Sequence, residues 1–247
     1  MQFRSNTKMA DVIHCNYLLL PILNRFDIQL GFGDKTIGEI CKEKGIYTDF
    51  FLVIINSFHD RDYFPQGKLL EFSLSLIIDY IHKSHSYYLT NKVPQVEALI
   101  HELSRKAAPE QKKQLTLIER FFSEYKNELT EHIEDEEQRV YPNVLLLDEA
   151  FNTGVIKDEH LALIREYPID AYARKHSNIE EKLYDLKNII IKYFSPAIDS
   201  ATSNALLTEI FRLERDLNDH ARIEDKVLVP KVRIIEQELL RRVHEQD

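Results

Sequence analysis

The chain has 247 residues and only 6 glycines, and its 41 aspartates and glutamates outnumber its 32 lysines and arginines. Sandwiches and barrels need many glycine-rich turns, so the composition argues against an all-β fold and favours an all-α one. A formal net charge of −9 disfavours non-specific binding to nucleic acid or to an anionic membrane, because both attract basic surfaces.

The sequence indicates a cytoplasmic protein. Its longest apolar stretches, 17–23 and 50–55, are far shorter than the ~20 residues of a membrane-spanning helix. Residues 1–8 lack the apolar stretch of a secretory signal. Two cysteines, Cys15 and Cys41, do not make a disulfide framework, and we expect both to be ordinary buried residues.

Residues 1–62 predict a small N-terminal helical domain. Thr36 and Glu39 have the spacing of a capping box, so a helix should begin there. Further on, Thr48 or Asp49 could cap another helix over the apolar run that follows them. That run is short enough to fit a buried strand as well.

A Pro- and Gly-containing break at 61–67 separates this domain from a second one, predicted over 68–243. Apolar residues then recur three and four positions apart, as is typical of amphipathic helices. Four long helices are predicted, at about 68–90, 110–148, 157–194 and 202–243. The expected loops are 91–94, 151–154 and 195–196, and Pro168 should start or kink the third helix. Four long helices with short connections predict an up-down-up-down four-helix bundle.

Two stretches of this bundle repeat a His-x-x-x-Glu motif in matching surroundings. Residues 128–142 and 216–230 both read acid-Leu-x-acid-His-x-x-x-Glu, with a proline ten residues after the histidine. A histidine and a glutamate four residues apart lie on one face of a helix. The partner helices add His82 and His85 in helix one and His176 in helix three. The pattern indicates a duplicated helical hairpin.

Histidines and glutamates on core-facing stripes point to bound metal. A buried imidazole or carboxylate without a partner is costly, and metal ions supply the compensation. Four histidines and two glutamates are too many for one tetrahedral zinc. Shared between two octahedral ions, they give two histidines per metal and two bridging carboxylates, a set that suits iron or manganese. The remaining positive charge favours an oxo or hydroxo bridge, with room for a diatomic molecule or peroxide.

The order His, His-x-x-x-Glu, His, His-x-x-x-Glu along four helices resembles the hemerythrin-like (HHE cation-binding) family. The small helical domain in front resembles that of the iron–sulfur cluster repair di-iron branch. The metal ligands that this resemblance implies are His82, His132, Glu136, His176, His220 and Glu224, with both glutamates bridging two iron ions. Manganese is the alternative metal. His85 is an alternative or additional ligand, since the family's spacing favours His82 whereas alignment of the two repeats favours His85.

The resemblance also implies a function. It predicts a non-haem di-iron protein of the nitrosative or oxidative stress response that helps restore damaged iron–sulfur proteins. The alternatives are a sensor or carrier that binds O₂ or NO, and a reductase of NO or peroxide. The family's small domain usually carries an adjacent cysteine pair followed by glycines, whereas residues 27–33 contain glycines and no cysteine. Family members often self-associate, so a homodimer is a further expectation.

Several other residues are assigned by their spacing alone. Glu128 and Asp216 stand one turn before His132 and His220, where each could accept the second N–H of the imidazole. Tyrosines that could border the site are Tyr80, Tyr125 and Tyr172. Histidines expected at the surface or in local hydrogen bonds are His14, His59, His101 and His244, and His160 is expected to be exposed rather than a ligand. No Gly-rich phosphate loop, Gly-x-Ser-x-Gly elbow or Cys-x-x-Cys pair occurs, so hydrolase and nucleotide-binding functions are not indicated.

Overall fold

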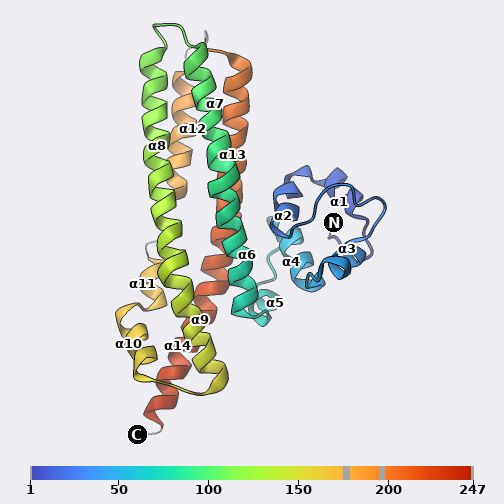
Figure 1. Cartoon of the computed structure of the whole chain (residues 1–247), viewed down its shortest axis with the longest axis vertical. Helices are drawn as coiled ribbons and strands as arrows, with labels where there is room; N and C mark the ends of the chain where they lie inside the picture. Colours follow the sequence, from blue (N-terminus) through green and yellow to red (C-terminus); the bar gives the residue numbers. More distant parts are fainter. Residues whose placement is uncertain (1, 175–178, 195–197, 246–247) are drawn as a thin grey trace. The chain divides into compact units, whose positions relative to one another are not determined.

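A computed structural model describes residues 2–174, 179–194 and 198–245 (Figure 1). Within these ranges the secondary structure is helical, apart from one isolated antiparallel bridge between Lys8 and Thr36. The predicted all-α fold class is therefore confirmed. The chain divides into two compact units, Met1–Lys83 and Ser84–Asp247, which are described separately. The domain bounds 1–62 and 68–243 stay a prediction.

Short helices make up most of the first unit. They are α1 (Met9–Cys15), the 3₁₀ turn η1 (Tyr17–Leu19), α2 (Leu20–Arg25), α3 (Ile37–Lys44), α4 (Thr48–His59) and α5 (Gln66–Glu71). The predicted capping box is confirmed, since the Thr36 side chain accepts from the Glu39 N–H and the Glu39 carboxylate accepts from the Thr36 N–H. The apolar run at 50–55 is helical, and its predicted caps are wrong: Tyr47 is the N-cap of α4 and its side chain makes no capping hydrogen bond.

An aromatic core holds these short helices together. Phe26 stacks on Tyr80 and meets Phe51 edge to face, while the buried Arg25 donates a 3.2 Å hydrogen bond to the Tyr80 hydroxyl. Tyr80 therefore belongs to the core of this unit, and its predicted place beside a metal site stays a prediction. The expectation for cysteines holds for Cys41, which is buried, but Cys15 is exposed.

The second unit contains the bundle, and three of its long helices each pass through a π-helical turn. Helix one is α6 (Leu74–Tyr87), η2 (Tyr88–Lys92) and α7 (Val93–Lys106), and helix two is α8 (Lys112–Asp135), η3 (Glu136–Val140) and α9 (Tyr141–Thr153). The third is broken into α10 (Asp158–Glu166), α11 (Ile169–Ala173) and α12 (Ile179–Tyr193). Helix four is α13 (Ser200–Ile223), η4 (Glu224–Leu228) and α14 (Val229–His244).

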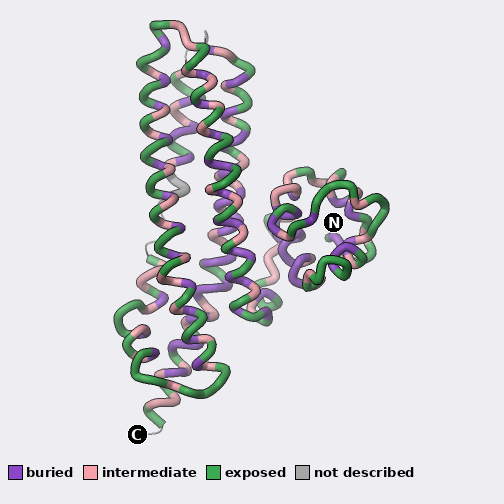
Figure 2. The backbone as a smooth tube through the Cα atoms, in the orientation of Figure 1, coloured by how far each residue is buried: buried purple, intermediate pink, exposed green. Residues whose placement is uncertain are grey.

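Packing between these helices follows the predicted up-down-up-down order. Helix α7 packs against α8 and α13, and α12 packs against the same two helices (Figure 1). The buried residues lie along the parts of the four helices that are turned to one another (Figure 2). Tyr125 lies in this apolar core together with Phe122 and Leu186, and its predicted role at the border of a metal site stays a prediction.

The structure corrects two of the predicted loops. In the loop predicted at 151–154, only Gly154 lies outside a helix, because α9 continues to Thr153. Residues 91–94 do not form a loop, because helix one continues through η2 into α7. The turn to helix two lies instead at 107–111. Pro168 is the N-cap of α11, as predicted, and Gly154 ends α9 with a φ of 73°, which glycine adopts without strain. The predicted loop at 195–196 lies outside the described residues.

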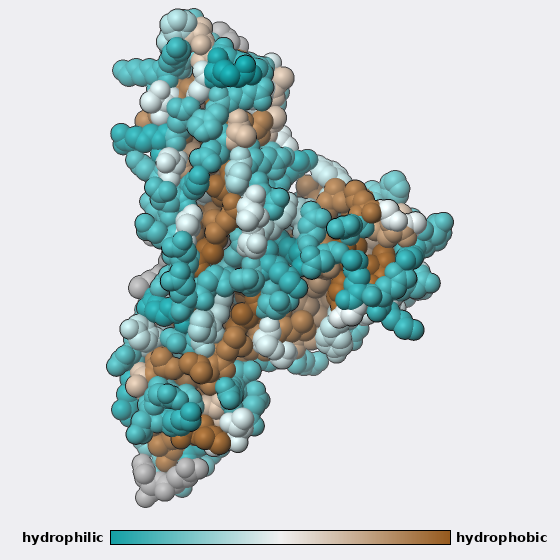
Figure 3. All heavy atoms as spheres, in the orientation of Figure 1, coloured by the Kyte–Doolittle hydropathy of each residue, from teal (hydrophilic) through white to brown (hydrophobic). Residues whose placement is uncertain are grey.

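On the face drawn in Figure 3, hydrophilic side chains predominate and hydrophobic ones form smaller patches. Across the described residues, none of the helices combines the length and the apolar character that crossing a membrane would require.

Candidate metal centre

Each π-helical turn of the bundle ends two residues before a proline. The turns begin at Tyr88, Glu136 and Glu224, and the prolines are Pro94, Pro142 and Pro230. Proline lacks an N–H, and its ring clashes with the carbonyl four residues earlier in an α-helix. A wider turn, with a hydrogen bond from residue i+5 to residue i, lets the helix continue past the proline. In two of the three helices the residue that opens this turn is the glutamate of the His-x-x-x-Glu motif.

Two histidines of helix one, His82 and His85, differ in how far they are buried. The imidazole of His85 is 3% exposed, whereas His82 is exposed to solvent. His85 Nε2 lies 3.0 Å from His220 Nε2 and 3.3 Å from Glu136 Oε2. The structure therefore brings His85, and not His82, into the cluster of polar groups inside the bundle.

Three residues from helices one and four converge most closely. One possible ligand atom from each of His85, His220 and Glu224 lies within 4.8 Å of the other two. His220 Nε2 is 3.4 Å from Glu224 Oε2, and the carboxylate of Glu224 is completely buried. Two imidazoles and a carboxylate thus face one small region.

Helix two supplies the other half of the cluster. His132 Nε2 lies 3.0 Å from Glu136 Oε1, one turn further along the same helix. Glu136 is 1% exposed, and its Oε1 also accepts a 2.7 Å hydrogen bond from the hydroxyl of Tyr172 on α11. The predicted position of Tyr172 at the border of the site is confirmed.

Tyr141 makes the corresponding contact to the second glutamate. Its buried hydroxyl donates a 2.5 Å hydrogen bond to Glu224 Oε1. Burial, followed by the charges of Glu224 and Glu136, raises the pKa of Tyr141 well above its usual value, and the same causes raise the pKa of Tyr172. Both phenols therefore keep their protons and act as hydrogen-bond donors to the carboxylates.

The tautomer of His85 is suited to metal binding. His85 Nδ1 lies 2.7 Å from Glu137 Oε1, and a carboxylate can only accept, so Nδ1 carries the proton of the neutral ring. Burial lowers the pKa of His85, although Glu137 opposes the effect. The Nε2 lone pair then lies 3.3 Å from Glu136 Oε2 and 3.0 Å from His220 Nε2, a position from which it can bind a cation together with these atoms.

Distances between the polar atoms fit a shared metal. Two adjacent ligand atoms held about 2.1 Å from an octahedral ion lie about 3 Å apart. The contacts among His85, His220, Glu136 and Glu224 fall between 3.0 and 3.4 Å. Two almost fully buried carboxylates also need positive charge nearby. The residues that the structure describes therefore fit bound divalent ions.

Some of the predicted residues do not make the contacts with the candidate metal-binding histidines that the sequence predicts. Glu128 is exposed and forms an ion pair with Lys182, so it is not placed to accept from His132. Asp216 is buried, but it accepts from the Tyr88 hydroxyl, and His220 Nδ1 has no hydrogen-bond partner among the described residues. His176 lies outside the described residues.

Sequence reasoning missed Glu137 and Tyr141. Glu137 follows the motif glutamate directly, and the equivalent residue of the second repeat, Asp225, is also acidic, which was the available signal. Tyr141 lies five residues after Glu136, and its backbone N–H bonds to the Glu136 carbonyl across the π turn. The equivalent residue of the second repeat is Val229, and this asymmetry between the repeats was the available signal.

Of the remaining histidines, His160 departs from the expected surface position. It is buried, and its Nδ1 accepts a hydrogen bond from the Lys157 N–H at the start of α10. The prediction that His160 is exposed is therefore wrong, and its ring is held by a local hydrogen bond instead. His101 lies at the surface, with Nδ1 3.7 Å from a Glu119 oxygen.

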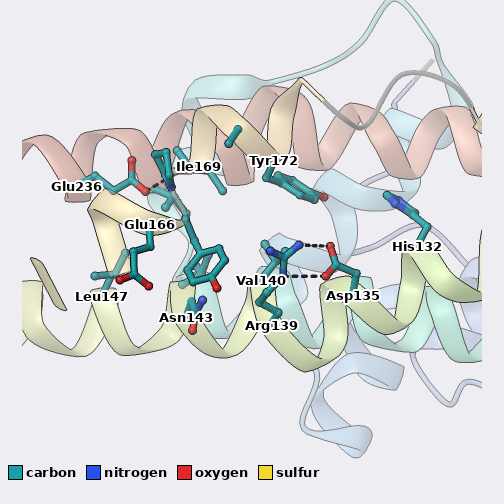
Figure 4. A pocket seen from close by; sticks show the side chains of 15 residues that line it. His132, Asp135, Arg139, Val140, Asn143, Leu147, Glu166, Ile169, Tyr172 and Glu236 are labelled. Atoms are coloured by element: carbon teal, nitrogen blue, oxygen red, sulfur yellow. Dashed lines mark hydrogen bonds and ion pairs between the residues drawn. The ribbon is translucent and has the colours of Figure 1, made fainter. Parts of the chain in front are cut away.

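A pocket of about 290 Å³ lies beside the cluster. It is lined by residues of α9, α14 and the α10–α11 segment, and it reaches His132 and Tyr172 at one end (Figure 4). A small molecule in this pocket would lie next to the His132 side of the cluster.

Comparison with known proteins gives one family. The family model described as the hemerythrin HHE cation binding domain matches residues 77–232, more than half of the chain. The matched range contains every residue of the cluster. None of the curated proteins matches the chain.

Proposed function

The chain belongs to the hemerythrin HHE cation-binding family, and on that premise we propose that its bundle holds a non-haem di-iron centre that binds a small exogenous ligand. The observation that carries the proposal is the convergence of His85, His220 and Glu224, with possible ligand atoms within 4.8 Å of one another. The exogenous ligand is O₂, NO or peroxide.

Two groups of residues would each hold one ion. His85 and His220 face the same region from two neighbouring helices, so they would share the first ion. His132 lies with Glu136 and would share the second ion with His176, the counterpart that the repeat predicts. Glu136 and Glu224 bridge the two, and His85 replaces His82 in the predicted ligand set.

The surrounding residues orient these ligands and limit access of water. Two iron ions, when bound, supply a redox-active pair that can take up a diatomic molecule or peroxide. The Tyr141 and Tyr172 hydroxyls hold one oxygen of each glutamate, which fixes the direction of the other. Buried apolar residues of η4 and α14, such as Val227 and Val229, restrict water around the Glu224 side.

The biological role proposed from the resemblance is defence against nitrosative or oxidative stress, with repair of iron–sulfur proteins as its form. A specific observation favours the alternative of an O₂ or NO sensor or carrier. The stretch 27–33 contains no cysteine, Cys41 is buried and Cys15 is exposed, so an adjacent thiol pair is lacking in the small domain. A carrier or sensor needs no such pair.

Metal analysis of protein purified without added metal tests the centre. We expect about two iron ions per chain and near-ultraviolet absorption from an oxo bridge. His220→Ala and Glu224→Ala should each lower the iron content, whereas His101→Ala, on the surface, should not. Iron contents that fall equally in all three variants, or protein with a single zinc, would contradict the proposal.

A second experiment separates the roles. Iron transfer from the loaded protein to an apo iron–sulfur protein is expected for repair, and reversible ligand binding without transfer is expected for a sensor or carrier. Consumption of NO or peroxide with an added electron donor would instead indicate a reductase.

A further inference from the structure

The pocket bounded by α9, α14 and the α10–α11 segment is far larger than a diatomic molecule requires. Its volume of about 290 Å³ compares with roughly 30 Å³ for the share of one water molecule in the liquid. It lies at the lower end of the range of pockets that bind small organic molecules. The pocket therefore has room for an organic compound of several carbon atoms.

Its floor is apolar, with one buried carboxylate. Val144, Leu147 and Val232 line the pocket and are buried. Glu236, on α14, lines it too and is 8% exposed. A charged group in such a place is unusual unless something pairs with it.

Only one oxygen of Glu236 is used by the described part of the chain. Its Oε1 accepts a 2.9 Å hydrogen bond from the Ile169 N–H at the start of α11 (Figure 4). No hydrogen bond or ion pair to the other oxygen, Oε2, occurs among the described residues. The nearby guanidinium of Arg233 is paired with Asp170, so Oε2 keeps its capacity to accept from a ligand.

The charges of the lining favour a cation. Three carboxylates, those of Asp135, Glu166 and Glu236, line the pocket with one guanidinium, that of Arg139. Arg139 is paired with Asp135 in a two-pronged contact and lies over the Tyr167 ring, 5.2 Å from its centroid. The acids that remain, Glu166 at the surface and Glu236 within, attract positive charge and repel anions.

We propose that this pocket binds a small organic ammonium compound, with its charged nitrogen donating to Glu236 Oε2 and its apolar body on Val144, Leu147 and Val232. Charge-assisted hydrogen bonds in a partly dry site are among the stronger polar contacts. This site goes beyond the proposed metal centre and does not depend on it, although His132 and Tyr172 border the same pocket.

Three probes with one apolar body and different head groups test the proposal. Pentylammonium, 1-pentanol and pentanoate are titrated into the full-length chain as purified, at pH 7.5, by calorimetry. We expect pentylammonium to bind roughly tenfold or more tightly than pentanol, and pentanoate to bind most weakly. Equal affinity of the three, tighter binding of pentanoate, or no binding of pentylammonium would each overturn the proposal.

Two variants locate the site. Glu236→Gln should weaken pentylammonium binding roughly ten- to hundred-fold and leave pentanol unchanged, while Glu149→Gln, exposed on α9 outside the pocket, should alter neither. Retained pentylammonium preference in Glu236→Gln would contradict the assignment. If that variant does not fold, crystals of the unmodified chain soaked with pentylammonium must show its nitrogen at Glu236, and density elsewhere would refute the site.

The iron content of the same samples separates the two proposals. Selective binding of pentylammonium by protein without iron would support this pocket and contradict the di-iron centre. Protein that contains two irons per chain and binds the three probes equally would support the di-iron centre and contradict the proposed ammonium site.

Discussion

At the scale of single residues, the choice between His82 and His85 shows what packing adds to sequence. The two lie three residues apart, roughly 60° around the helix, so either could face a partner helix. His85 is buried with its Nδ1 against Glu137 and its Nε2 against His220, whereas His82 is exposed. The neighbours of each ring, which the sequence does not show, decide between them.

Replacing each of these histidines in turn tests the assignment. His85→Ala should remove at least half of the bound iron, because one ion loses a nitrogen ligand and its hydrogen bond to Glu137. His82→Ala is the matched control and should keep the iron content of the unmodified chain. Iron analysis and near-ultraviolet absorption of both variants provide the measurement, and the opposite ranking would restore His82 as the ligand.

Tyr141 is expected to strengthen metal binding through Glu224. Tyr141→Phe removes the 2.5 Å hydrogen bond but keeps the buried ring, so the fold should persist. We expect iron to be lost to a chelator several-fold faster than from the unmodified chain. Tyr125→Phe makes the same change in the apolar core and should leave the rate unaltered; equal rates for both variants would argue against a role for Tyr141.

Glu236 should make stability depend on pH. Burial raises its pKa from 4.5 to about 6, so the folded chain binds the proton more tightly than the unfolded chain, and stability falls as pH rises from about 4.5 to 6. The free energy of unfolding decreases by about 2 kcal/mol as a result of this pKa shift. Glu236→Gln removes this dependence and should therefore be more stable than the unmodified chain at pH 7. Urea unfolding at pH 4.5 and at pH 7 measures the free energy of unfolding of both, with Glu149→Gln as the control. A difference between Glu236→Gln and the unmodified chain that does not change with pH would contradict this account.

At the scale of elements, the prolines explain both a success and an error of prediction. The matching prolines of the repeats helped to identify the duplicated hairpins. The sequence around Pro94 instead predicts a loop, whereas in the structure helix one continues past this proline by means of a π turn. A proline in sequence indicates that the α-helical hydrogen-bond pattern must change, but whether the helix ends or widens depends on the helices packed against it.

The π turns should matter for the positions of the glutamates. Pro142→Ala restores an N–H and allows η3 to become α-helical, which would rotate Tyr141 and the rest of α9 relative to His132 and Glu136. We expect iron affinity to fall about tenfold or more while helicity by circular dichroism is unchanged. Pro94→Ala relaxes a turn that carries no glutamate and should have a smaller effect; a larger loss of iron in Pro94→Ala would contradict the account.

At the scale of the whole molecule, periodicity and repetition were sufficient to predict the all-α bundle. The apolar spacing gives four long helices, and the repeated motif predicts core-facing positions for its histidines and glutamates, of which Glu136, His220 and Glu224 are buried and His132 is half-buried. Contacts between different helices, such as Tyr141 with Glu224 and Glu137 with His85, depend on relative rotation and could not be predicted from spacing within one helix. The pocket was also beyond prediction, because it forms where α10 and α11 break the third helix.

Anomalous X-ray scattering from crystals of the full-length chain, recorded on both sides of the iron absorption edge, tests the central claim most directly. The account predicts two peaks roughly 3.5 to 4 Å apart, one adjoining His85, His220 and Glu224 and the other adjoining His132 and Glu136. A map without peaks among these side chains, or with one peak that persists only at the zinc edge, would contradict it.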